Sequence, residues 1–273
     1  MRDWPARQWY LVNSRSVEAV PAASLRARGN HDARQLSQAR WLLRRKRDGR
    51  FLATLDAAER LHPMHWQARR HDPGLADFLL EFTSGATPDE LPTDRTEAFL
   101  RALGVPGDYG ERHALPLVPE PGLLTFAGFD RYRRPLWLQA SAATAWQRMQ
   151  AAARVDGEML EAISGYRSHD YQLGIFQRKL ARGLGVEEIL AVNAAPGFSE
   201  HHSGRALDIS CPGEPAAEES FEHTSAFDWL CEHAGRFGFA MSYPRDNPHG
   251  IVYEPWHWCH REPGAPATTD SRH

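Results

Sequence analysis

Two short segments that combine histidine with acidic residues place the strongest constraint on how this chain can fold. The first is Ser199–Asp208 and the second is Glu254–His257. A catalytic zinc ion needs three protein ligands and one position left for water. It also needs a carboxylate that is not a ligand and that takes the proton from this water. The two segments together supply these groups, so the fold has to bring them to one place.

By residue type, His201, Asp208 and His257 can serve as the ligands and Glu254 as the base. His202 is as suitable a ligand as His201, because a neutral imidazole at either position can bind zinc. A short Glu-x-x-His match alone occurs often by chance. From the residues alone, the choice between the two neighbouring histidines stays open.

The second segment makes a demand on the backbone. Glu254 and His257 would point to opposite faces of a regular strand. Both side chains reach one site only if the strand kinks or ends there. Pro255 lies between them and cannot donate to a sheet ladder. The sequence therefore predicts an interrupted strand at this point.

Four ordered blocks of the chain resemble the zinc D-alanyl-D-alanine carboxypeptidases, a family that includes enzymes of one form of vancomycin resistance. Residues 199–208 match the signature Ser-x-His-x-x-Gly-x-Ala-x-Asp. The other three blocks are Ser-Gly-Tyr-Arg-Ser at 164–168, Arg-Phe-Gly-Phe at 236–239 and Tyr-Glu-Pro-Trp-His at 253–257. The resemblance covers roughly residues 130–260, and several motifs in the right order rarely match by chance. The family is related to L,D-carboxypeptidases and L-alanyl-D-glutamate endopeptidases.

Carried over position by position, the resemblance implies zinc ligands at His201, Asp208 and His257, which favours His201 over His202. The family usually has aromatic residues after the last ligand, whereas this chain has Trp-Cys-His at 258–260. His260 is expected to be a rim histidine, and it is the reserve candidate for a group near the metal.

The resemblance also implies the roles of four other side chains. Glu254 falls on the catalytic acid and base, and Arg167 on the arginine that stabilises the transition state. Ser199 and Gln172 fall on positions that hold the substrate. These residues are expected to act with Zn²⁺ as the cofactor.

The implied function is hydrolysis of peptidoglycan stem peptides or muropeptides, with removal of a C-terminal D-amino acid. The alternatives are an L,D-carboxypeptidase or an L-alanyl-D-glutamate endopeptidase acting on the same peptides. A third alternative is a non-catalytic zinc module that binds the cell wall, but such a module would not need Glu254 and Arg167.

Composition excludes few partners. The net charge is -3 with histidine neutral, which gives no reason to expect nucleic acid or an anionic membrane. No segment approaches the roughly 18 consecutive apolar residues of a membrane helix. The first 20 residues lack the apolar core of a signal peptide. The substrate points to the cell envelope, and without a visible export signal a cytoplasmic location stays open.

The expected fold class is α+β, with a small antiparallel sheet flanked by helices around the zinc site. A mainly helical region of unknown role, residues 1–110, is expected to precede the zinc peptidase domain at 111–262. This expectation rests on helical spacing of apolar residues at 33–47, 51–58, 75–82 and 93–103. Residues 263–273 are expected to form a disordered tail. The first region is also expected to be dispensable for cleavage of small peptides.

Overall fold

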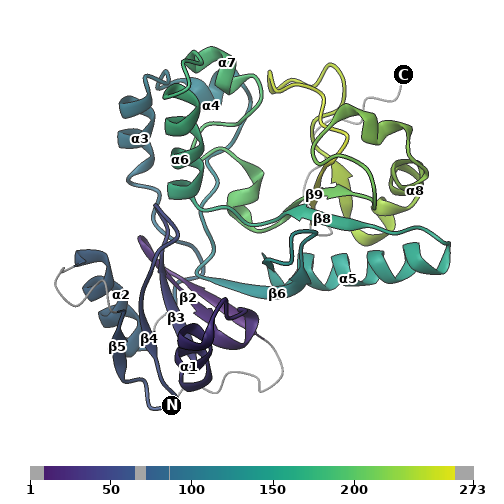
Figure 1. The fold of residues 1–273 in the computed structure, drawn as a ribbon. Coiled ribbons are helices and arrows are strands. Elements are labelled where there is room, and N and C mark those ends of the chain that lie inside the picture. Colours follow the sequence, from purple (N-terminus) through teal and green to yellow (C-terminus); the bar gives the residue numbers. More distant parts are fainter. Residues whose placement is uncertain (1–8, 65–71, 86, 262–273) are drawn as a thin grey trace.

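The protein forms two antiparallel sheets, seen here in a computed structural model that describes residues 9–64, 72–85 and 87–261 (Figure 1). A seven-stranded sheet has the order β5-β4-β3-β2-β1-β6-β7, and a four-stranded sheet has the order β10-β11-β9-β8. The strands of the first sheet are β1 (Tyr10–Asn13), β2 (Val17–Pro21), β3 (Trp41–Arg45), β4 (Phe51–Leu55), β5 (Leu61–Pro63), β6 (Leu123–Phe129) and β7 (Pro135–Leu138). Those of the second are β8 (Glu161–Ser164), β9 (Ala206–Ser210), β10 (Phe239–Met241) and β11 (His257–His260).

Helices cover both sheets, and the predicted class, α+β with an antiparallel sheet flanked by helices, is confirmed. They are α1 (Asn30–Gln38), α2 (Pro73–Ser84), α3 (Thr96–Leu103), α4 (Tyr109–Arg112), α5 (Ala140–Val155), α6 (His169–Leu180), α7 (Val186–Leu190) and α8 (Ser225–His233). None of the helices in the described part of the chain is both long and apolar enough to cross a membrane. The tail predicted to be disordered lies outside the described residues.

The prediction of a mainly helical N-terminal region is wrong. Residues 41–45 and 51–55 are neighbouring antiparallel strands, β3 and β4, rather than parts of helices. Leu42 and Leu43 are both buried although they point to opposite faces of the sheet. Strands covered on both faces lose the alternating pattern, so their apolar runs resemble buried helix. The predicted helices at 75–82 and 93–103 correspond to α2 and α3.

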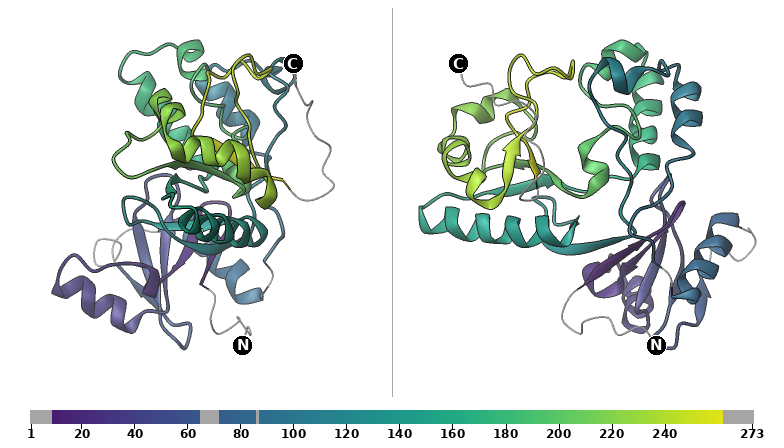
Figure 2. Two further views of the ribbon diagram at one scale, coloured as in Figure 1. Left: turned by 90° about the vertical axis from the view of Figure 1, so that its right-hand side faces the viewer. Right: turned by 180° about the vertical axis from the view of Figure 1, so that it is seen from behind.

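The seven-stranded sheet joins the N-terminal region to the C-terminal half. Strand β1 pairs with β2 on one side and with β6 on the other. Leu11 lies opposite Leu124, and Asn13 N–H donates to Gly122 O at 2.8 Å. The same sheet continues through β7 directly into α5, which runs beneath the four-stranded sheet (Figures 1 and 2). The first strands are therefore hydrogen-bonded into the scaffold of the C-terminal half.

Two apolar cores position the central strands β9 and β11. Helix α5 packs Trp146 and Met149 against Leu207, Ile209 and Trp258, all of which are buried. Full burial of each such side chain contributes roughly 1.5–3 kcal/mol. A second core joins α3, α4, α6 and α7 to the loop that precedes β11. The loop before β11 is thus held between the two cores.

Candidate active site

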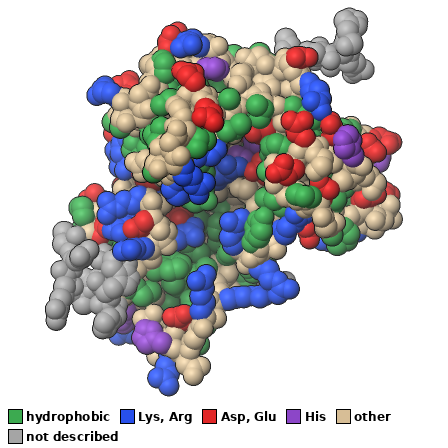
Figure 3. All heavy atoms as spheres, turned by 45° about the horizontal axis from the view of Figure 1, so that its top comes forward, with side chains coloured by type: hydrophobic (Ala, Val, Ile, Leu, Met, Phe, Trp, Pro, Cys, Tyr) green, Lys and Arg blue, Asp and Glu red, His purple; other side chains and the backbone are tan. Residues whose placement is uncertain are grey.

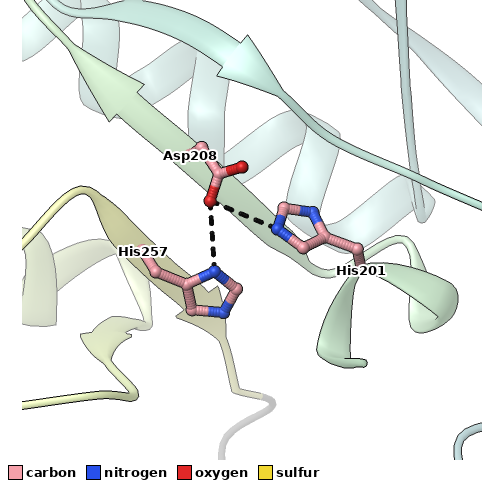
Figure 4. A group of neighbouring side chains, drawn as sticks. All are labelled: His201, Asp208 and His257. Carbon is pink, nitrogen blue, oxygen red and sulfur yellow. Dashed lines mark hydrogen bonds and ion pairs between the residues drawn. The ribbon is translucent and has the colours of Figure 1, made fainter. Parts of the chain in front are cut away.

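Three side chains from three different elements meet at the centre of the four-stranded sheet. His201 lies in a 3-10 turn, Glu200–Ser203; Asp208 is in β9, and His257 is the first residue of β11. Asp208 and His257 are opposite each other across the two strands. His201 Nε2 and His257 Nδ1 each lie 3.2 Å from Asp208 Oδ1 (Figure 4). All three residues are buried.

The orientation of the two rings suits a metal. His201 Nδ1 lies 2.7 Å from Gly165 O, so Nδ1 carries the proton and the lone pair of Nε2 faces Asp208 and Arg167. His257 Nε2 lies 2.9 Å from Glu200 Oε2, which leaves Nδ1 to face Asp208. The three ligand atoms lie within 4.8 Å of one another. Ligand atoms around a tetrahedral zinc with bonds near 2.0–2.1 Å are about 3.3 Å apart, so this donor set fits zinc.

The charges of the three groups follow from their surroundings. Burial, and next the Arg167 charge, lower the pKa of His201 to about 4, so its ring is neutral. Burial would raise the pKa of Asp208, but His201 and Arg167 hold it well below its usual range. Burial lowers the pKa of His257, yet hydrogen bonds to Asp208 and Glu200 outweigh it and raise the pKa to about 10. A metal ion that binds here has to displace the His257 proton.

Arg167 borders the same three candidate ligands from the turn between β8 and α6. Its Nη2 lies 2.5 Å from Asp208 Oδ2 and 2.6 Å from His201 Nε2. Its Nε donates to Ser164 Oγ at 3.1 Å. The Arg167 side chain is one-fifth exposed, and it lines the pocket next to these residues. These contacts bring the predicted arginine to the predicted ligands.

Glu254 reaches the site because it lies outside any strand, three positions before β11 begins. Residues 251–254 form no strand, and His257 N–H donates to Glu254 O at 3.1 Å, which closes a tight turn around Pro255. Glu254 Oε2 lies 3.9 Å from His257 Nδ1. Burial raises the pKa of Glu254 to about 7, despite the opposing charge of His257. A carboxylate with this pKa can exchange a proton near neutral pH.

Comparison with known proteins places these residues in a family. Residues 135–262 match the model of VanY, described as D-alanyl-D-alanine carboxypeptidase. A solved structure of a vancomycin-resistance D,D-pentapeptidase, a VanY variant in complex with Zn(II), is 30% identical, and the match covers 45% of this chain and 72% of that one with a TM-score of 0.38. The chain belongs to the VanY family.

Two curated relatives extend this finding. YodJ of Bacillus subtilis (strain 168), provisionally classed as a carboxypeptidase, is 34% identical over 155 residues, which are 54% of this chain and 56% of YodJ. The dipeptidase and carboxypeptidase VanXYC of Enterococcus gallinarum is 28% identical over 153 residues, which are 54% of this chain and 78% of that protein. The chain thus spans little more than half the length of YodJ. Both relatives are named as peptidases, which supports a family of peptidases.

A pocket of about 310 Å³ is lined by His201, Asp208, His257, Arg167 and Glu254. Figure 3 looks onto a face of the molecule that is hollowed, with histidine and basic side chains visible inside the hollow. Ser199 and Gln172, predicted to hold the substrate, both line the pocket and are buried. Gln172 Nε2 donates to Ala194 O at 2.8 Å, and its Oε1 has no partner within the described residues. In this arrangement Gln172 offers an acceptor, and Ser199 offers a hydroxyl donor.

His202 is placed so that neither of its ring nitrogens can bind a metal. Its Nδ1 donates to Arg167 O at 2.7 Å, and its Nε2 accepts from Gly197 N–H at 3.1 Å. The ring is fully buried, and this burial holds the pKa of His202 well below its usual range. His202 therefore fixes the backbone of Arg167, while His201 faces the ligand cluster.

Glu200, which lies between Ser199 and His201 in the signature, is a further residue of the site that was not predicted from the sequence. Its carboxylate accepts from His257 Nε2. Burial would raise the pKa of Glu200, but the hydrogen bond from His257 lowers it to about 2. Metal-bound histidines usually donate their second ring nitrogen to a carboxylate or carbonyl. The available signal was a glutamate next to His201, because its carboxylate could accept a hydrogen bond from the other histidine, His257.

His260 lies away from the ligand cluster. It packs against the Phe239 ring and borders a different pocket, together with Arg236 and Arg261. It lies three positions after His257 along β11, so the two rings point to opposite faces. Cys211, Cys231 and Cys259 are all free thiols.

Proposed function

We propose that this chain is a zinc-dependent peptidase that removes a C-terminal D-amino acid from peptidoglycan stem peptides. One observation carries the proposal: His201, Asp208 and His257 converge on one pocket with Arg167 and Glu254. A VanY relative that is 30% identical was solved with Zn(II). A wall-binding module without activity would have no use for a buried carboxylate whose pKa lies near 7.

His201 Nε2, Asp208 Oδ1 and His257 Nδ1 would hold the ion. When bound, zinc acts as a Lewis acid and lowers the pKa of a water molecule toward about 7. The protein supplies a fixed arrangement for this chemistry, since Gly165 O orients one ring and Glu200 the other. Asp208 contributes a negative charge to the ligand set.

The reaction is hydrolysis of a peptide bond. Glu254 takes a proton from the attacking water as the water oxygen bonds to the carbonyl carbon. Glu254 then passes that proton to the leaving amine as the carbon–nitrogen bond breaks. The partly exposed guanidinium of Arg167 donates to the carbonyl oxygen as negative charge develops there.

The C-terminal carboxylate of the substrate requires donors. Ser199 supplies a hydroxyl inside the pocket. Gln172 Nε2 gives one of its two N–H groups to Ala194 O, and its Oε1 would accept from a peptide N–H of the substrate. A donor or acceptor left buried without a partner costs about 1–3 kcal/mol. Peptides without a free C-terminal carboxylate are therefore expected to be poor substrates.

The test compares kcat/KM for one stem pentapeptide ending in D-Ala-D-Ala with its C-terminal amide, in the zinc-loaded protein. The last peptide bond of the acid is expected to be cleaved at least tenfold faster than that of the amide, from the loss of about 1.4 kcal/mol or more. Mass spectrometry of the products identifies the bond. Equal rates for the two peptides, or cleavage of an internal bond, would refute removal of a terminal residue. If the protein leaves the pentapeptide intact and cleaves only a stem tetrapeptide that ends in one D-alanine, it is an L,D-carboxypeptidase.

A further inference from the structure

A buried ion pair lies outside the active site, where the N-terminal sheet meets the turn that carries Arg167. Lys46 follows β3, and its side chain is fully buried. Its Nζ lies 2.7 Å from Oε2 of Glu120, whose side chain is only 6% exposed. Two strands, β4 and β5, and three helices, α2, α3 and α4, lie between the two residues in sequence, so this pair joins distant parts of the fold. The proposed mechanism uses neither residue.

Two residues that flank Arg167 in sequence donate hydrogen bonds to Glu120. The Tyr166 hydroxyl, one residue before Arg167, donates to Glu120 Oε2. His169 N–H, two residues after Arg167, donates to Glu120 Oε1 at 3.0 Å. Asn13 of β1 donates to the Tyr166 hydroxyl at 2.8 Å. The turn 166–169 is thus tied at each end to one carboxylate.

The same cluster reaches the carbonyl of Arg167 through two histidines. The ring of His169 packs edge-on against the ring of His202, with centroids 4.4 Å apart. His202 Nδ1 donates to Arg167 O. The residues around Arg167 are therefore held by a chain of hydrogen bonds and ring contacts. This chain includes Lys46 and Asn13 of the N-terminal region.

The energetics of the pair favour a positioning role over a purely stabilising one. Removing water from two charges is costly, and a buried ion pair is often no more stabilising than apolar residues of the same size. Burial would raise the pKa of Glu120, but Lys46 and His169 lower it to about 2, so the carboxylate is charged. A charged carboxylate accepts stronger and more directional hydrogen bonds than a neutral group.

We infer that Lys46 and Glu120 are positioning residues for Arg167, so that the N-terminal sheet is part of the catalytic unit. The inference rests on the proposed function in giving Arg167 its role at the substrate carbonyl. Misplacement of a catalytic group by about 1 Å can reduce turnover about 100-fold. A chain shortened to begin near Leu115 would lose Lys46, Asn13 and the strand that pairs with β6, so it is expected to be inactive even on small peptides.

The test uses the full chain with both charges removed, Lys46→Met with Glu120→Gln, because removing one alone would strand a buried charge. Tyr166→Phe is a milder second variant, which leaves the ion pair and removes one link to the turn. The matched control is Arg44→Met with Glu18→Gln. This control removes a 2.6 Å ion pair between neighbouring strands of the same sheet.

The first readout is the effect on kcat in two backgrounds. In the presence of Arg167, the double variant is expected to lower kcat about 10–100-fold, with unchanged zinc affinity. In an Arg167→Ala background the same two substitutions should change kcat less than about twofold, because the residue through which they act is gone. The control should change the melting temperature without changing kcat. Equal losses in both backgrounds, or no loss in the first, would overturn the inference.

The second readout is independent of activity. The ¹⁵Nε–H signal of Arg167, assigned by its loss in Arg167→Lys, reports whether the guanidinium is held in place. This signal is expected to move to the position of free arginine side chains in the double variant and to shift in Tyr166→Phe. An unchanged signal in both variants would refute positioning even if the protein proved to cut another bond. A shifted signal in a protein that cuts no peptide would uphold positioning and remove the proposed function.

Discussion

Replacing Glu200 tests whether the ligand geometry is built by the protein around it. Glu200 Oε2 lies 2.9 Å from His257 Nε2, and its pKa of about 2 keeps it charged. Loss of such a partner typically weakens metal binding about 10–100-fold, or about 1.4–2.7 kcal/mol. Glu200→Ala removes the acceptor, whereas Glu200→Gln keeps a neutral one. The affinity for zinc should therefore fall most in the alanine variant.

The size of this effect depends on pH in a defined direction. Glu200 helps to raise the pKa of His257 to about 10, so at pH 7 the ion has to displace a tightly held proton. Removing Glu200 lowers that pKa and makes the proton easier to displace, which opposes the loss of orientation. The competition with protons fades as the pH rises. The loss in affinity should therefore be larger at pH 9 than at pH 7.

Competition with a chromophoric chelator at both pH values measures the zinc dissociation constant. Glu218→Gln, at an exposed glutamate in the same half of the chain, is the matched control for the change in net charge. Circular dichroism confirms that each variant is folded. Dissociation constants equal to that of the unaltered protein at both pH values, in Glu200→Ala, would show that Glu200 has no part in orienting His257.

Other expected outcomes concern the base, the ligands and the pH profile. Glu254→Gln should keep zinc and lower kcat about 10²–10⁴-fold. Near-normal turnover, measured from the product formed at fixed times, would show that another group is the base. His257→Ala should lose zinc by elemental analysis, whereas His202→Ala should keep zinc and lose stability; the reverse result would contradict the ligand assignment. Glu254 must be deprotonated to act, and its pKa is raised to about 7. Activity should therefore fall as the pH drops through 7, or through a lower value if the bound cation lowers this pKa; an acid limb above pH 8 would contradict Glu254 as the base.

The sequence predicted the elements of the C-terminal half well because their apolar patterns are one-sided. Helix α5, for example, buries one face and leaves the other to solvent. The N-terminal strands gave the opposite result. Asp48 and Gly49 form the turn of the β3–β4 hairpin, where Arg45 N–H donates to Arg50 O and Gly49 has a φ of 69°. An Asp-Gly pair between apolar runs is a hairpin signal, and it should have outweighed the helical spacing.

The residues of the candidate site also fall into two groups. Some can be predicted from short segments of the sequence, and others depend on contacts between distant segments. Ligands could be named because zinc chemistry restricts residue types and spacing within short segments. The groups that hold Arg167 carry no such local mark. Lys46 belongs to a basic run at 44–47, and such runs are usually solvated. Within this run, Lys46 alone is fully buried by side chain, because its partner Glu120 arrives from 74 residues away. This long-range contact, rather than any local pattern, makes Lys46 a buried lysine that supports the active site.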